Sequence, residues 1–269
     1  MSFYLSNRRT FVISAVLFFS FFCFIKIEAQ VWQNYKKDGV NINYLEADKG
    51  EITKIAAYLK NGSRTIKKFF GKKFPKSFEV YLYPDRKSLT EAWRKDWNAP
   101  DFESQCWMVA SGTASKLMLL SPRTWRTEAC EHNPDDSNDT QFVITHEMVH
   151  VFHGQNNPNP NFDSMDDVGW FVEGLATYAS GQLAGAKLAG AREAIEKGKE
   201  PKELENAWSG KYRYGVSGSI VKYIDTRFGR KILFKMLRGT NEKELLGMLN
   251  LSEGDLLSAW KDFVLKPRA

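Results

Sequence analysis

The chain has 269 residues, of which 43% are hydrophobic, 14% aromatic and 26% charged, a balance that indicates a globular protein and excludes disordered, collagen-like and polytopic membrane chains. The formal net charge is +6, but residues 1–29 hold three basic side chains and one acidic one, so the other 240 residues carry 35 basic against 31 acidic groups, a net of +4. No stripe rich in lysine and arginine accompanies this charge, and we therefore expect no nucleic-acid partner.

The first segment, 1–29, has the pattern of a signal peptide. Two arginines precede an apolar run over 11–25, which is short for a membrane span and typical of the hydrophobic region of an export signal. Cleavage after Ala29 would leave Gln30 as the mature N-terminus. We expect a secreted, periplasmic or otherwise extracytoplasmic protein; the alternative is an uncleaved membrane anchor, which is the one case in which the membrane would be a partner.

Export changes the interpretation of the cysteines. Cys23 lies within the signal, so the mature chain keeps Cys106 and Cys130. In an oxidising compartment this pair predicts one disulfide, and the alternative is two buried free thiols. The spacing excludes a C-x-x-C metal site.

Hydrophobic periodicity predicts a mixture of helices and strands in the first half of the chain. The predicted elements are a helix within 46–71, a strand over 77–84, a short helix over 86–97 and short strands over 106–111 and 116–121. A small mixed sheet is expected from these strands.

The second half of the chain is predicted to be helical. The predicted helices span 140–153, 168–184, 186–197, 216–228, 230–238, 242–249 and 253–265. Gly229 stands where a helix C-cap is expected, and Ser252 three residues before Asp255 resembles a capping box. The fold class is therefore α+β, a small mixed sheet followed by a helical half. We divide the chain into 1–29, an N-terminal segment 30–76 whose long helix packs on the rest, and a main domain 77–269.

The sequence His146-Glu147-Met148-Val149-His150 is an H-E-x-x-H motif within the predicted helix 140–153. Residues four apart lie on one helix face about 6 Å apart, so both imidazoles can bind one cation. Glu147 projects beside them, where it can take a proton from a metal-bound water. The motif predicts two zinc ligands and a general base, and the alternative is an amphipathic helix whose histidines face a polar groove.

A catalytic zinc site needs a third protein ligand. His153 lies about 4–5 Å further along the helix axis than His150, which favours a role in lining the groove. Glu173 is the stronger candidate, because the loop after the helix allows a second helix, with Asp167 as its expected N-cap, to return antiparallel to the first. It is also the one charged residue within 168–179, and a lone buried charge is rarely left unpaired. The alternative is a surface glutamate.

The motif followed by Trp170-Phe-Val-Glu-Gly-Leu-Ala-Thr-Tyr178 resembles the gluzincins, the peptidase MA-like zinc metallopeptidases, over roughly 77–265. The resemblance implies a zincin (thermolysin-like) catalytic fold, a single Zn²⁺ held by His146, His150 and Glu173, and hydrolysis of a peptide or protein substrate with Glu147 as general base. It also implies Tyr214 as a donor to the oxyanion, with Tyr212 as the fallback and simple packing as the alternative for either. Thr177 stands where thermolysin has an aspartate, which leaves the partner of the zinc-bound histidines open.

We expect an endopeptidase, because 77–139 contains no G-x-M-E-N motif of the kind that related aminopeptidases use to bind a substrate amino group. Strand 106–111 or 116–121 is expected to supply an edge onto which an extended peptide adds. The alternatives are a non-catalytic zincin-fold module that binds peptides and a membrane-anchored regulatory or structural protein. The sequence indicates neither the substrate's identity nor the oligomeric state.

Overall fold

The computed structural model describes residues 31–37 and 39–266, so the predicted signal peptide lies outside the described residues. The chain divides into two units, 1–30 and 31–269, and all of the described helices and strands belong to the second. Within the described residues, none of the helices combines the length and apolar character needed to cross a bilayer.

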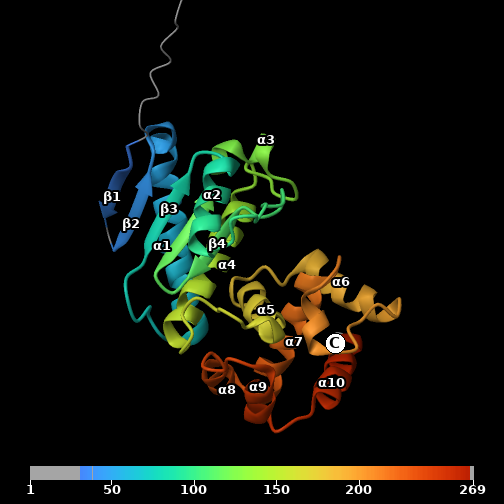
Figure 1. Cartoon of the computed structure of the whole chain (residues 1–269). Helices are drawn as coiled ribbons and strands as arrows, with labels where there is room; N and C mark the ends of the chain where they lie inside the picture. The colour runs from blue at the N-terminus through green and yellow to red at the C-terminus, as the bar shows by residue number, and fades with distance from the viewer. Residues whose placement is uncertain (1–30, 38, 267–269) are drawn as a thin grey trace, which may run out of the picture. The chain divides into compact units, whose positions relative to one another are not determined.

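The first half of this unit contains a mixed sheet (Figure 1). Its described strands are β1 (Gln33–Lys37), β2 (Val40–Tyr44), β3 (Glu79–Tyr83), β4 (Ala110–Thr113) and β5 (Lys116–Leu120), in the order β1-β2-β3-β5-β4. The three inner strands β2, β3 and β5 run parallel, while β1 and β4 pair antiparallel at the two edges. The predicted strand 77–84 is confirmed as β3.

The other strand predictions need correction. The predicted strand 106–111 begins only at Ala110, and the segment before it is irregular. The prediction that 116–121 could be an edge is wrong, because β5 lies between β3 and β4. Strands β1 and β2 were not predicted, since polar residues dominate the first and asparagines interrupt the second.

Helices cover the sheet. The predicted helix within 46–71 is confirmed as a 3₁₀ turn (Glu46–Glu51) that leads into α1 (Ile52–Phe70), and α1 packs against α4 (Ser137–Asn156). Helix α4 contacts β4 and β5, and α2 (Arg86–Asp96) contacts β3 and β5. Consecutive residues 117–120 of β5 are all buried, as expected for a strand covered on both faces. Short helical turns follow β5 at Pro122–Thr124 and as α3 (Trp125–Glu128).

The second half of the unit is helical, as predicted. Besides α4, its helices are α5 (Gly169–Ala179), α6 (Gly185–Glu196), α7 (Arg213–Phe228), α8 (Arg230–Met236), α9 (Glu242–Leu249) and α10 (Glu253–Leu265), with 3₁₀ turns at Asp166–Val168 and Leu204–Trp208. The helix predicted over 168–184 ends early, at Ala179, and the helix predicted over 140–153 is longer at both ends, as α4. Helix α5 packs between α4 and α7.

Two of the three predicted caps are confirmed. Gly229 follows α7 with φ +83°, and its N–H donates to the Asp225 carbonyl. The Ser252 hydroxyl accepts from the N–H of Asp255 at 3.1 Å. The prediction for Asp167 is wrong: Val168 precedes α5, and the Asp167 carboxylate instead accepts from the Glu242 N–H at 2.9 Å, at the start of α9.

Candidate metal centre

Helix α4 presents the H-E-x-x-H residues to a cavity between the sheet and the helical half. The rings of His146 and His150 lie one turn apart, with their centroids separated by 4.8 Å, and both side chains are largely buried. Glu147 lies beside them and also lines the cavity. The helical spacing therefore places these side chains as the sequence predicts.

Glu173 of α5 meets the two histidines. Its Oε2 is 3.1 Å from His146 Nε2, and its Oε1 is 3.6 Å from His150 Nε2. One donor atom from each of the three residues lies within 4.8 Å of the others. His153 does not join them, because it is fully buried between Phe162 and Phe171, with ring centroids 4.9 and 5.7 Å away.

Gln182, which follows α5, fixes the orientation of the His146 ring. The Nδ1–H of His146 donates to Gln182 Oε1 at 2.9 Å, which leaves the lone pair of Nε2 directed to the Glu173 side. No sequence pattern predicts this role for Gln182. Thr177, which stands where thermolysin has an aspartate, is fully buried and does not contact His146 by a hydrogen bond. A glutamine nine residues after the glutamate has no recognisable spacing signal.

The charges of the cluster favour a cation. Burial raises the pKa of Glu147 above its ordinary value, against the opposing effect of the two imidazoles. Burial alone would also raise the pKa of Glu173, but His150 and His146 outweigh it, and without a bound cation that pKa lies well below its ordinary value. Two imidazole nitrogens and one ionised carboxylate converging in a buried place are the donor set that divalent zinc takes.

The cavity has a volume of about 440 Å³. The sheet side contributes Ala110, Ser111 and Gly112 of β4, and the helical side contributes Val172, Lys187 and Tyr214. A Cβ on Gly112 would lie 2.3 Å from the Glu147 carbonyl oxygen, so glycine at this position allows the edge strand to lie directly against α4. The edge strand β4 thus runs beside the histidines, and a Cβ on Gly112 would lie 3.2 Å from the Cβ of His150.

The structure separates the two candidate tyrosines. Tyr214 lines the cavity, with its ring centroid 6.3 Å from that of His146 and the Lys187 ammonium 4.0 Å above its ring. Burial, together with the Glu173 charge, raises the pKa of Tyr214 to about 12, which keeps its hydroxyl protonated. The hydroxyl of Tyr212 instead donates to Glu193 at 2.8 Å, and this residue is not part of the cavity lining.

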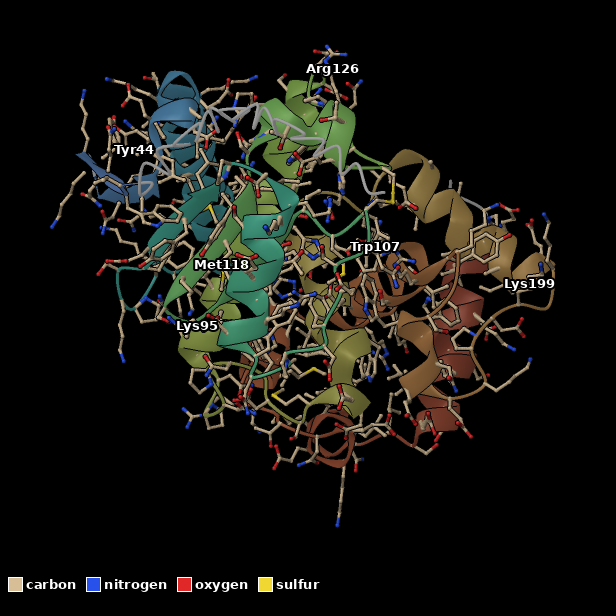
Figure 2. All side chains as sticks on the ribbon, turned by 45° about the horizontal axis from the view of Figure 1, so that its top comes forward. Tyr44, Lys95, Trp107, Met118, Arg126 and Lys199 are labelled. Carbon is tan, nitrogen blue, oxygen red and sulfur yellow. A yellow bond between two sulfur atoms is a disulfide. The ribbon has the colours of Figure 1, made fainter. Side chains whose placement is uncertain are left out.

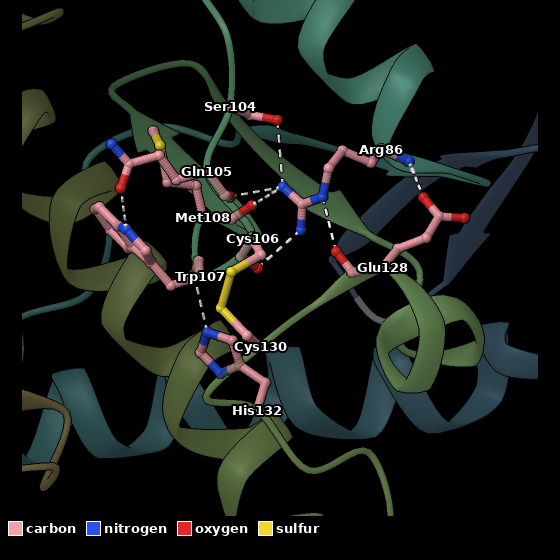
Figure 3. The surroundings of a disulfide bond; sticks show 9 residues. All are labelled: Arg86, Ser104, Gln105, Cys106, Trp107, Met108, Glu128, Cys130 and His132. Atoms are coloured by element: carbon pink, nitrogen blue, oxygen red, sulfur yellow. Dashed lines mark hydrogen bonds between the residues drawn. A yellow bond between two sulfur atoms is a disulfide. The ribbon is translucent and has the colours of Figure 1, made fainter.

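The predicted disulfide between Cys106 and Cys130 is present (Figure 3). It joins the irregular segment before β4 to the segment before α4. Trp107, which follows Cys106, and His132, two residues after Cys130, line the cavity. The alternative of two free thiols is therefore wrong.

No family model matches this chain, and no curated protein matches it. Among solved structures it is similar to a crystal structure of M1 zinc metallopeptidase from Deinococcus radiodurans, with 16% identity, 85% of this chain and 50% of that chain covered, and a TM-score of 0.44. A mutant of that enzyme bound to a Tyr-Ser-Ala substrate gives 15% identity, 89% and 53% coverage, and a TM-score of 0.41. This chain spans about half the length of those structures, and similarity at this level carries neither their fold nor their activity over to it.

Proposed function

We propose that this chain is a zinc-dependent peptide hydrolase and, more specifically, an endopeptidase. The observation that carries the proposal is the convergence of His146, His150 and Glu173 beside Glu147 in an open cavity. Two histidines and one glutamate leave a fourth position for water or substrate, which is the arrangement of catalytic zinc sites. A bound Zn²⁺ would supply Lewis acidity, polarising a carbonyl and lowering the pKa of water.

Three side chains around the metal centre have separate roles in this proposal. Glu147 takes the proton of the attacking water and delivers it to the departing amine. Tyr214 keeps its proton and donates a hydrogen bond to the developing oxyanion. Gln182 holds His146 in the tautomer whose Nε2 can bind a cation.

The edge of β4 binds the substrate in this proposal. One side of β4 pairs with β5, and among the described residues no strand pairs with the other side. An extended peptide adding to this edge would form main-chain hydrogen bonds and pass in front of the histidines. This mode supports an endopeptidase, as does the missing amino-group motif in 77–139.

We also propose a thermolysin-like zincin fold and export from the cytoplasm. The fold assignment is supported by the sequence resemblance, together with the placement of the motif helix beside an antiparallel edge strand. Export is supported by the apolar run over 11–25 and by the disulfide, which persists in oxidising compartments. Sequencing the N-terminus of the natural product tests this: a start at Gln30 is expected, and a start at Met1 would mean that the segment is retained as an anchor.

The activity is tested with a panel of internally quenched peptides and free-amine aminoacyl reporters, with and without a chelator. We expect cleavage within the quenched peptides, loss of cleavage with chelator and recovery on adding zinc. Cleavage of aminoacyl reporters alone would indicate an aminopeptidase. Zinc and peptide binding with no cleavage of any reporter would contradict the enzymatic role and indicate a binding module.

A further inference from the structure

The segment 104–109, which leads into β4, is fastened to the sheet half by Arg86 at the start of α2 (Figure 3). The Arg86 guanidinium donates to the carbonyl oxygens of Gln105, Cys106 and Met108 at 2.8, 2.9 and 2.9 Å. It also donates to the Ser104 hydroxyl and, through Nε, to the Glu128 carbonyl. A planar guanidinium can hold several acceptors in one fixed arrangement, so this segment has little freedom to bend.

Two further attachments hold the same segment. The disulfide joins Cys106 to Cys130, and the Cys130 N–H donates to the Cys106 carbonyl at 3.1 Å. The Nε2–H of His132 donates to the Trp107 carbonyl at 3.0 Å. The backbone around Trp107 is therefore fixed from both sides.

The side chain of Trp107 contacts the opposite half of the unit. The guanidinium of Arg213, the first residue of α7, lies 4.5 Å from the Trp107 ring centroid. The same guanidinium lies 5.1 Å from the ring of Tyr214 and 5.7 Å from that of Trp208. All three aromatic residues line the cavity, and Figure 2 shows Trp107 where the sheet half meets the helical half.

We propose that Trp107 and Arg213 determine specificity by closing one side of the cavity, so that extended peptide chains reach His146 and His150 while folded protein surfaces do not. This inference rests on the proposed peptidase function and adds the substrate class. Because the backbone of 104–109 is held by Arg86 and the disulfide, widening the cavity requires breaking the contact between Trp107 and Arg213. A partly desolvated cation–π contact of this kind shifts the equilibrium between the narrow and the widened cavity roughly tenfold toward the narrow one.

The test compares one cleavable sequence in two contexts, a short quenched peptide and a loop of a stably folded protein. We expect the ratio of kcat/KM for the folded substrate to that for the peptide to rise about tenfold in Arg213→Ala and in Trp107→Ala. Arg213→Lys and Trp107→Phe keep a cation and a ring, and their ratios should stay closer to wild type. Arg227→Ala is the matched control, because it removes an arginine–aromatic contact from the exposed end of the same helix.

A double-mutant cycle on the unfolding equilibrium measures the contact without any assay of activity. Trp107→Ala and Arg213→Ala should be coupled. Each substitution should change the equilibrium constant of unfolding severalfold less in a protein that already carries the other substitution than in the wild-type protein. An unchanged substrate ratio in both variants, or the absence of coupling, would overturn the inference while leaving the peptidase function intact. A wild-type protein that cleaves neither substrate would instead overturn both.

Discussion

His146 has two ring nitrogens, and the hydrogen bond to Gln182 decides which of them faces Glu173. The sequence predicts His146, His150 and Glu173 because helical spacing and a lone charge in an apolar helix are local signals. Gln182 carries no such signal. It reaches His146 because the chain turns back after α5, where the Leu183 N–H donates to the Thr177 carbonyl.

Replacing Gln182 with leucine should weaken zinc binding by about 10- to 100-fold, because His146 loses the partner that fixes its ring and tautomer. A competition titration against a chromogenic chelator measures the affinity. Gln141→Leu is the matched control, since Gln141 lies on α4 but bonds to Tyr58 and Thr145 instead of a histidine. Equal zinc affinities in the two variants would show that Gln182 does not support the site.

Replacing Glu147 with glutamine should lower kcat by about 10²- to 10⁴-fold while zinc remains bound, since the amide keeps the shape of the side chain but cannot accept the proton. Steady-state kinetics on a quenched peptide, with metal analysis of the same sample, checks both parts. Turnover at the wild-type level would exclude Glu147 as the base.

At the scale of elements, the site depends on how closely α5 approaches α7. A Cβ on Gly174 would lie 2.5 Å from the Ser217 carbonyl oxygen. Because Glu173 is the neighbouring residue, any displacement of α5 moves a predicted zinc ligand. The sequence indicates this approach only through the small residues around Glu173.

Gly174→Ala should therefore destabilise the protein by about 1–3 kcal/mol through overpacking. Gly169→Ala is the control within the same helix, because the nearest atom to its Cβ would be 3.9 Å away, in Trp208. The free energy of unfolding in denaturant distinguishes the two variants. Equal free energies of unfolding for the two variants would mean that α5 and α7 can move apart without loss of stability.

Helices and strands with a strong hydrophobic periodicity were predictable from the sequence. Elements whose bounds depend on contacts with residues far away in the chain were not. The long helices and β3 follow from their own residues. Strand β1 is a polar edge strand that exists because β2 pairs with it, and β4 begins late because Arg86 and the disulfide hold the preceding backbone in an irregular conformation. Such contacts depend on residues far apart in the chain.

At the scale of the whole described unit, the disulfide links segments that are 24 residues apart and lie on one wall of the cavity. Replacing Cys106 and Cys130 together with alanine should lower the free energy of unfolding by about 3 kcal/mol, from the closure entropy of a loop of this length. Denaturation of the variant, compared with the oxidised protein, measures the loss. A change close to zero would mean that Arg86 and His132 alone hold the segment.

The zinc content per chain after exhaustive dialysis measures whether His146, His150 and Glu173 bind one divalent ion. The wild-type protein and Glu147→Gln should each retain one zinc ion per chain, whereas Glu173→Ala should retain clearly less. A wild-type protein without zinc, or a Glu173→Ala protein with full stoichiometry, would mean that these three residues do not form a zinc site.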